Sequence, residues 1–327
     1  MSKSIVEYSY GPVPSRRLGK SLGINNIPPK ICSYSCIYCQ VGRTFRTSTD
    51  RRVFYAPENI YQHIQNRLNT IKRIDEKIDY LTFVPDGEPT LDLNLGREIE
   101  WIKTLKIPVG VITNSSLLER DDVKEDLAKA DWVSLKLDAV QQPLWVRLNR
   151  PCKELHLSNI LDGIQEFARS FSGTLVTETM LVQGLNDDPG HIRELSDFLN
   201  HLQPDTAYLS IPTRPPAEKW VKGSNETVLN QAYHILAEKV PRVEYLVGYE
   251  GNAFACTNDI ERDILSITAV HPLREEAIAE ILARMDASWE LIDRLISQGD
   301  LVMREYEQHR FFLRNFTKSL KRGTEYA

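Results

Sequence analysis

Apolar and polar residues follow two periods along roughly the first three quarters of the chain. Short runs rich in β-branched and aromatic residues, each ending in a polar turn, are typical of buried strands, and stretches with apolar residues every three or four positions are typical of amphipathic helices. The runs predict six strands, at residues 80–87, 107–116, 132–139, 173–184, 206–213 and 243–251. The periodic stretches predict six helices, at 56–73, 92–106, 119–130, 155–170, 189–203 and 226–240.

This alternation of strand and helix predicts an α/β fold. Strands separated by helices pair in parallel, because a crossover helix returns the chain to the same end of the sheet, and the result is an α/β barrel or a doubly wound sheet. In such folds the chemistry lies on the loops that leave the carboxyl ends of the strands. Polar runs fall at those ends, namely PDGEPT at 85–90, TNSS at 113–116, LDA at 137–139 and TRPP at 213–216.

The pattern changes at about residue 259. Three helical stretches precede two short strand-like runs, at 260–272, 274–285, 288–299, 300–306 and 309–315. Three helices followed by a hairpin are typical of a winged helix, a relative of the helix-turn-helix. We therefore expect a barrel over residues 1–256, a small winged-helix-like domain over 259–316 and a polar tail over 317–327.

The composition is that of an ordinary globular protein. The 327 residues are 42% apolar and 26% charged, and the net charge of −5 does not suggest a protein that coats nucleic acid. No apolar run has the length of a signal peptide or a membrane span, so we expect no membrane association. Five cysteines, three of them clustered, make a poor disulfide framework, which favours the reducing cytoplasm.

The clustered cysteines carry the clearest chemical signal. Cys32, Cys36 and Cys39 lie in the segment CSYSCIYC, whereas Cys152 and Cys256 are isolated, so we expect no second cluster there. Three small buried residues and a zinc site are alternatives, but structural zinc usually takes four ligands in two separated pairs. Iron–sulfur clusters are held by cysteine thiolates. Three thiolates on one loop can hold three corners of a cubane and leave the fourth iron open to a ligand.

The cysteine loop resembles that of the radical S-adenosylmethionine (SAM) superfamily, whose pattern is Cys-x-x-x-Cys-x-aromatic-Cys. Tyr38 stands in the aromatic place. The family's glycine-glycine-glutamate motif, which ends the second strand, is similar to DGEP at 86–89, where Asp86 replaces one glycine. The resemblance covers roughly residues 10–256 and implies a partial (β/α)6 barrel. GPVPSRRLGKSLGIN, GEPTLD and VSLKLDA resemble one branch, the iron–sulfur oxidoreductases related to wybutosine-synthesis enzymes, which act on tRNA.

The resemblance also implies the chemistry. Cys32, Cys36 and Cys39 would ligate a 4Fe–4S cluster, and the amino and carboxylate groups of SAM would chelate the fourth iron. An electron from a low-potential donor of flavodoxin or ferredoxin type would cleave SAM to methionine and a 5′-deoxyadenosyl radical, which abstracts hydrogen from a substrate. Tyr38 would lie against the adenine or the cluster, with a core tyrosine as the alternative.

The DGEP motif contributes two further candidates. Gly87 allows a close approach of the backbone, so its carbonyl would suit the ammonium group of the cofactor. Glu88 accepts hydrogen bonds only, when ionised, and would suit the same ammonium. An ordinary turn glutamate is the alternative for Glu88.

Other candidates lie at later strand ends. Period-two alternation in WVSLKLDA places Ser134, Lys136 and Asp138 on one face, which should point into the barrel. Lys136 is then a candidate for the cofactor carboxylate and Asp138 for a ribose or substrate hydroxyl, with a structural ion pair as the alternative. The remaining candidates are Asn114, where a helix N-cap is the alternative, Glu178, Arg214 and a substrate loop at 149–151.

The C-terminal domain and two basic runs suggest classes of substrate. The third helix of that domain is mildly acidic, and the basic residues are Arg310, Arg314, Lys318, Lys321 and Arg322 near the end and Arg43, Arg46, Arg51 and Arg52 after the cysteine loop. Such runs are commonly solvated surface, but these could guide a polyanionic partner. Three functions remain: a radical enzyme that modifies RNA or protein captured by this domain, a radical enzyme acting on a small metabolite, and a non-catalytic redox regulator. Polar strand ends argue against the regulator, because a sensor needs no cofactor pocket.

Overall fold

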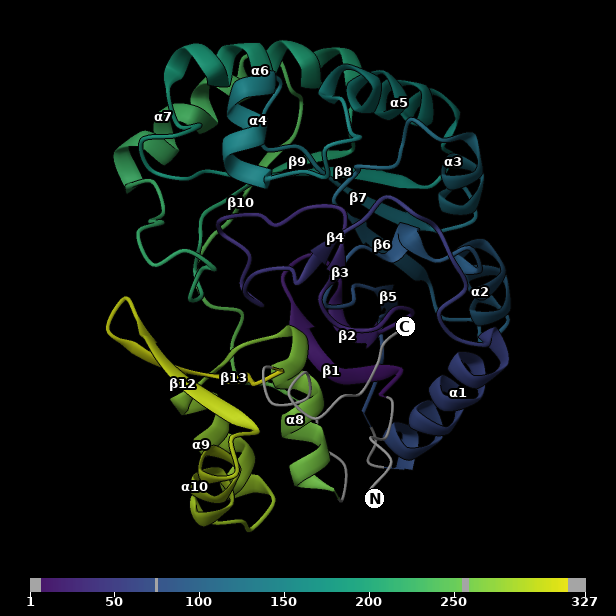
Figure 1. Ribbon diagram of the computed structural model, residues 1–327, viewed down its shortest axis with the longest axis vertical. Helices are drawn as coiled ribbons and strands as arrows, with labels where there is room; N and C mark the ends of the chain where they lie inside the picture. The colour runs from purple at the N-terminus through teal and green to yellow at the C-terminus, as the bar shows by residue number, and fades with distance from the viewer. Residues whose placement is uncertain (1–6, 74–75, 255–258, 317–327) are drawn as a thin grey trace.

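A computed structural model describes residues 7–73, 76–254 and 259–316 (Figure 1). Cys256 and the predicted polar tail at 317–327 lie outside the described residues. No helix in the described ranges is both long and apolar enough to cross a membrane.

A curled sheet of eight strands forms a partial barrel, as the sequence predicts. Its order is β1-β2-β5-β6-β7-β8-β9-β10, and neighbours from β2 to β10 pair in parallel, whereas β1 is antiparallel to β2. The bounds are β1 Ser9–Ser15, β2 Gly19–Ile24, β5 Tyr80–Phe83, β6 Val109–Thr113, β7 Trp132–Lys136, β8 Thr174–Met180, β9 Thr206–Ser210 and β10 Val243–Leu246. All six predicted strands correspond to β5–β10.

Helices cover the outer face of this sheet (Figure 1). They are α1 Pro57–Arg73, α2 Leu95–Lys103, α3 Asp121–Leu127, α4 Gln142–Asn149, α5 Leu157–Ser170, α6 Pro189–Leu202 and α7 Glu226–Ala237. The alternation along β7 places Val133 and Leu135 in the core between sheet and helices, while Ser134 and Lys136 face the inside of the barrel. Two short strands, β3 Ile31–Cys32 and β4 Arg46–Thr47, pair across the cysteine loop, and a 3₁₀ turn, η1 Pro89–Leu91, follows DGEP.

The sequence analysis missed the hairpin of β1 and β2 and also missed α4. The segment SYGPVPS in β1 carries two prolines and a glycine, residue types that are depleted in strands, and β2 is short and contains two glycines. Helix α4 has only eight residues, with a proline at its start. Because β2 precedes the cysteine loop, the parallel part of the barrel has one strand more than the six predicted.

The C-terminal part of the chain has the order expected of a winged helix. Its elements are α8 Ile260–Val270, β11 Leu273–Arg274, α9 Glu275–Arg284, α10 Glu290–Ser297, β12 Leu301–Tyr306 and β13 His309–Arg314. They enclose an apolar cluster of their own, which includes Ile264, Ile278 and Leu295. Val13 of β1 packs against this cluster, and Arg67 of α1 forms an ion pair of 2.6 Å with Asp263. The two parts share an interface, and the domain boundary stays a prediction.

Two buried carboxyl groups lie at the start of α2. Asp92 is 0% exposed and Glu98 is 1% exposed. Burial raises the pKa of Glu98 to about 9, and the charge of Asp92 adds to this effect. Burial also raises the pKa of Asp92 to about 7. Glu98 therefore keeps its proton in the folded protein at neutral pH.

Glu98→Gln should flatten the pH dependence of stability. In the unfolded chain a glutamate loses its proton near pH 4.3, whereas folded Glu98 keeps it up to about pH 9. The folded state binds more protons in this window, so the stability of the wild type falls as the pH rises through it. The variant should have the higher urea midpoint at pH 8 to 9. Denaturation of the apo protein from pH 5 to 9 checks this, with the exposed Glu100→Gln as control; parallel profiles for wild type and Glu98→Gln would contradict it.

Candidate cofactor site

The cysteine loop is fastened on one side to the end of β5. Ile31 forms a bridge with Gly87, and the Ile31 carbonyl accepts a hydrogen bond of 3.1 Å from the amide of Glu88. A Cβ atom on Gly87 would lie 1.9 Å from the Ile31 oxygen. The approach is too close for any side chain, which explains the glycine in DGEP.

On its other side the loop is fastened to the end of α4. The amides of Ser35 and Ile37 donate to the carbonyls of Asn149 and Leu148, at 3.0 and 2.9 Å. Slightly further on, the amide of Cys152 donates to the carbonyl of Ser33 at 2.9 Å. The loop has little secondary structure of its own, so these bonds position its cysteines.

Cys32, Cys36 and Cys39 are partly exposed as whole residues, but their sulfur atoms lie in buried surroundings. Burial raises the pKa of Cys36 to about 12 and raises the pKa values of Cys32 and Cys39. The charge of Glu88 adds to the rise at Cys32, and that of Cys39 adds to the rise at Cys36. Side-chain amides lie 3.4 Å from two of the sulfurs, Asn114 beside Cys32 and Asn149 beside Cys36. Because burial disfavours the charged form of each cysteine, the thiolates form only with a positively charged centre, such as iron, between them.

A 4Fe–4S cluster fits these residues. No three His, Cys, Asp or Glu side chains in the described ranges converge tightly enough to hold a single metal ion. Iron–sulfur clusters take cysteine thiolates as ligands and this one loop supplies three of them, whereas structural zinc usually takes four protein ligands. The buried Oδ1 of Asn149 has no hydrogen-bond partner within the described protein and remains an acceptor for a bound group.

A chain of buried ion pairs fills the barrel below the loop. Glu178 of β8 lies 2.9 Å from the Lys136 amine and 2.7 Å from the Arg17 guanidinium. Arg17 also donates to the Ser134 hydroxyl at 3.2 Å. Burial alone would raise the pKa of Glu178, but these two cations outweigh it and hold the pKa well below its usual range.

The chain of charges continues to the cysteine loop through Asp138 and Tyr38. Lys136 lies 3.7 Å from the Asp138 carboxylate and 5.2 Å from the centre of the Tyr38 ring. The Tyr38 hydroxyl donates to Asp138. The structure therefore brings together Tyr38, Ser134, Lys136, Asp138 and Glu178, and their first partners are one another.

Glu88 fastens the end of β6 to that of β5. Its carboxylate accepts 2.6 Å bonds from the hydroxyls of Thr90 and Thr113, and bonds of 3.1 and 2.7 Å from the amides of Thr90 and Asn114. Burial raises its pKa despite these donors. These four donors use most of the hydrogen-bonding capacity of the Glu88 carboxylate. A contact between Glu88 and the cofactor ammonium stays a prediction.

Arg214 lies in a different cluster from the other candidates. Its guanidinium donates to Gln40 at 2.5 Å, forms an ion pair with Glu250 and lies 3.2 Å from His271. Burial lowers the pKa of His271 to about 3, and the charge of Arg214 adds to this effect. Arg214 thus connects the residue after Cys39 to the C-terminal part rather than to Lys136.

The sequence analysis missed Lys30 and Arg17. Lys30 is buried and lies 2.9 Å from Asp86, whose pKa burial raises to about 6. This pair explains the aspartate in place of a glycine. Lys30 lies in no motif, and Arg17 lies in GPVPSRRLGKSLGIN, but each meets its partner only through the fold.

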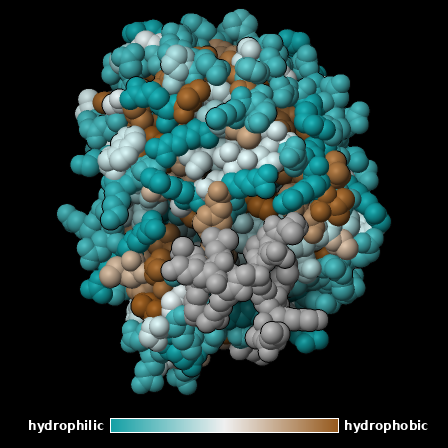
Figure 2. Space-filling view, in the orientation of Figure 1, coloured by the Kyte–Doolittle hydropathy of each residue, from teal (hydrophilic) through white to brown (hydrophobic). Residues whose placement is uncertain are grey.

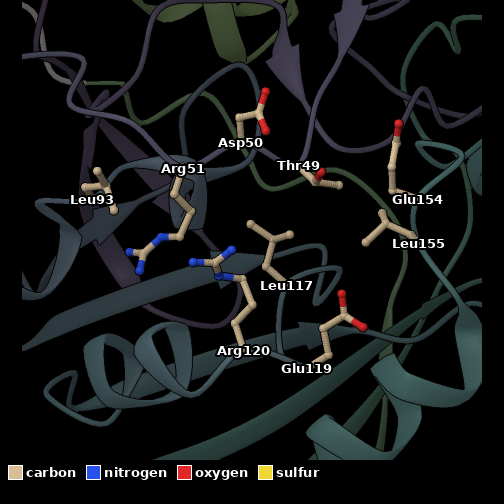
Figure 3. A pocket seen from close by; sticks show the side chains of 9 residues that line it. All are labelled: Thr49, Asp50, Arg51, Leu93, Leu117, Glu119, Arg120, Glu154 and Leu155. Carbon is tan, nitrogen blue, oxygen red and sulfur yellow. The ribbon is translucent and has the colours of Figure 1, made fainter.

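A cavity of about 320 Å³ lies outside this group (Figure 3). It is bounded by the segment after β4, the turn after β6 and the loop after Cys152, and it contains none of the predicted site residues. Arg51 on its wall is already bound to Asp122 and Asp126, at 2.7 and 2.5 Å. A much smaller space does adjoin Asn114, Lys136, Asp138 and Asn149.

Glu178→Gln should destabilise the apo protein by about 3–5 kcal/mol, because it leaves Arg17 and Lys136 buried without their shared carboxylate. Urea denaturation at pH 7 measures the loss. The control is Glu166→Gln, which removes an exposed partner of Lys124 and should cost about 1 kcal/mol at most. Equal losses in the two variants would show that the interior charges do not depend on Glu178.

Alanine at Cys32, Cys36 or Cys39 should abolish the cluster, because two thiolates do not hold a cubane against exchange. The Cys152→Ala and Cys256→Ala proteins should keep about four irons per chain. Iron analysis and absorption spectra after anaerobic reconstitution check both statements. A full cluster in the Cys36→Ala protein would contradict the assignment.

Comparisons with known proteins agree with this geometry. The model of the radical SAM superfamily matches residues 26–197, more than half of the chain. A UPF0026 protein of Methanocaldococcus jannaschii is 44% identical over 309 residues, covering 94% of this chain and 96% of the relative. A UPF0026 protein of Synechocystis is 38% identical over 218 residues, covering 65% of this chain and 79% of the relative.

Solved structures share the fold. TYW1 with a lysine–pyruvate adduct bound has a TM-score of 0.52 and 18% identity, covering 67% of this chain and 74% of that chain. At this identity the likeness concerns the fold alone. The chain therefore belongs to the radical SAM superfamily and, within it, to the UPF0026 family, and it is a radical SAM enzyme whose cofactors are a 4Fe–4S cluster and SAM.

Proposed function

We propose that this enzyme modifies RNA, abstracting hydrogen from a nucleotide held across the loops at the carboxyl ends of the strands. The supporting observation is a surface of exposed aromatic and basic side chains beside the cysteine loop. We call it the mouth surface, and it consists of Arg43, Phe45, Arg150, Lys219, Trp220 and Lys222.

The aromatic members of the mouth surface are unusually open to solvent. Trp220 is 56% exposed and Phe45 is 51% exposed. The face of the molecule in Figure 2 is mostly hydrophilic, with apolar side chains in small separate groups. Exposed rings set among polar residues suit the stacking of unpaired bases, which contributes about 1–3 kcal/mol per base.

The basic members lie on segments that are fastened to the cysteine loop. Arg43 and Arg150 both pair with Glu218, whose amide donates to the Ile37 carbonyl at 3.0 Å. Lys219 and Lys222 are exposed and form no ion pair within the described residues. Four cations thus stand beside one carboxylate, a balance that favours a phosphate backbone.

The C-terminal part lies next to this surface. The Tyr306 hydroxyl donates to the Pro212 carbonyl at 3.0 Å, and Gln40 donates to the Val270 carbonyl at 3.3 Å. Its helix α10 carries Glu290 and Asp293 in the first turn, which does not favour insertion into a DNA groove. We infer that the C-terminal part supports a macromolecule at the mouth surface and does not read duplex DNA.

When bound, the cluster would relay an electron and SAM would supply the 5′-deoxyadenosyl radical. The chain encloses them: burial of the cysteine loop excludes water, and the electron enters from a low-potential flavodoxin or ferredoxin type of donor in the cytoplasm. Lys136, charged and held by Glu178, is the candidate for the SAM carboxylate, and Asp138 orients Tyr38.

The finer branch, related to wybutosine synthesis, is part of this proposal. TYW1 was solved with a lysine–pyruvate adduct. Here burial would lower the pKa of Lys136, but Glu178 and Asp138 outweigh it and raise the pKa. A protonated amine does not attack a carbonyl, so the proposal includes no such adduct at Lys136. A small metabolite or a peptide is the competing substrate.

Deuterium transfer identifies the substrate class. Reconstituted, reduced enzyme is incubated anaerobically with SAM and with deuterated RNA, protein or metabolite fractions. We expect deuterium in 5′-deoxyadenosine from the RNA fraction alone. Transfer from protein or metabolites, or the absence of transfer from the RNA fraction, would overturn the RNA assignment.

The mouth surface gives two separable mutational effects. Lys219→Ala with Lys222→Ala should weaken RNA binding and reduce the slope of log K against log salt by roughly 1.4, because each phosphate contact to a single strand contributes about 0.7. Trp220→Ala should cost about 1–3 kcal/mol and leave the slope unchanged. Binding titrations at several salt concentrations measure both, with Trp101→Ala on α2 as control. Unchanged affinity in all mouth variants would remove the surface from the proposal.

A further inference from the structure

Helix α4 ends in a way that turns Asn149 toward the cysteine loop. Arg150 adopts a left-handed conformation with φ of 44°, and its amide closes the helix on the Val146 carbonyl. This ending exposes the carbonyls of Leu148 and Asn149 to the amides of Ile37 and Ser35. The Asn149 side chain is consequently buried, at 2% exposure.

The side-chain amide of Asn149 joins a cysteine ligand to the interior charges. Its Nδ2 lies 3.4 Å from the Cys36 sulfur, 2.8 Å from the Asp138 carboxylate and 3.1 Å from the Tyr38 hydroxyl. Asp138 is in turn 3.7 Å from the Lys136 amine. The Asn149 amide is thus a neutral donor between the Asp138 carboxylate and the Cys36 sulfur, which is a thiolate when it ligates iron.

Asn149 has a different environment from the other asparagine of the site. Asn114 lies 3.4 Å from the Cys32 sulfur, but its amide also donates to the Ser33 hydroxyl at 2.8 Å, a neutral partner. Asn149 instead donates to both a cysteine sulfur and a carboxylate of the interior, a pair of partners that Asn114 does not have. The sequence analysis had assigned it only to a candidate substrate loop.

Donors to cluster sulfurs shift the reduction potential, because the reduced cluster carries one more negative charge and accepts the hydrogen bond more strongly. Without the amide, Cys36 and Asp138 would keep only the Tyr38 hydroxyl between them. We propose that Asn149 is a positioning residue that holds Cys36 as a ligand and raises the reduction potential of the cluster. The inference requires the cluster, and it is independent of the substrate.

The experiment uses full-length protein, reconstituted anaerobically and titrated redox-potentiometrically without SAM or substrate. Asn149→Leu keeps the size of the side chain and removes the donor. Its midpoint potential should move to a more negative value, so that at a fixed potential the ratio of reduced to oxidised cluster falls about tenfold, which for a one-electron couple is about 59 mV. The spectrum of the reduced cluster in electron paramagnetic resonance should change as well.

The matched control is Val146→Ala, an exposed position on the same helix, which should leave the midpoint unchanged. Thermal unfolding of the apo proteins shows whether each variant folds, and Asn149→Ala replaces the leucine variant if that one does not. Loss of iron in the Asn149 variants, with apo stability like that of Val146→Ala, would support the holding role. A full cluster with the wild-type midpoint in an Asn149 variant would overturn the proposal, whatever substrate the enzyme uses.

Discussion

The contact between the Ile31 carbonyl and Gly87 is the constraint on which the site depends. The cysteine loop has no helix and only a two-residue strand at Cys32, so it cannot position three sulfurs by itself. Bonding at Gly87 holds one side and the end of α4 holds the other. Because a Cβ atom at Gly87 would meet the oxygen at 1.9 Å, the first of these anchors excludes every other residue type. The loop is rigid because it is fastened at both sides to elements of the barrel.

Burial of charge is the second requirement of this arrangement. Arg17, Glu178, Lys136 and Asp138 alternate in sign from the hairpin turn to the loop, so each ion has a partner of opposite charge. Unpaired, any of them would cost several kcal/mol in so dry an interior. The alternation ends at the Asn149 amide, a neutral donor placed where a further carboxylate or thiolate would repel. The charge nearest Cys36 is thus the negative Asp138, and the Asn149 amide donates to both of them.

Local patterns predicted much of this site, and tertiary contacts explain what they missed. Period two along β7 was enough to place Ser134 and Lys136 inside the barrel, and cysteine spacing was enough to identify the loop. Arg17 meets Ser134 across 117 positions, which no local pattern contains. Helix α4 is too short to show a clear period, so Asn149 could not be placed. Arg214 was predicted on the correct strand end, but its partners depend on how the C-terminal part docks.

The same contacts connect the mouth surface, where we propose that the substrate binds, to the cofactor site. The Glu218 amide donates to the carbonyl of Ile37, which lies between two cysteines, and the Glu218 carboxylate holds Arg43 and Arg150 of the mouth surface. Trp220 lies only two residues further along the same segment. A partner that displaced this segment would pull on the cysteine loop directly, whereas one that bound without displacing it would meet a preformed cluster. Two cations and a backbone hydrogen bond all hold Glu218, so the geometry favours a partner that binds without displacing this segment. Recognition at the mouth surface then need not reorganise the ligands of the cluster.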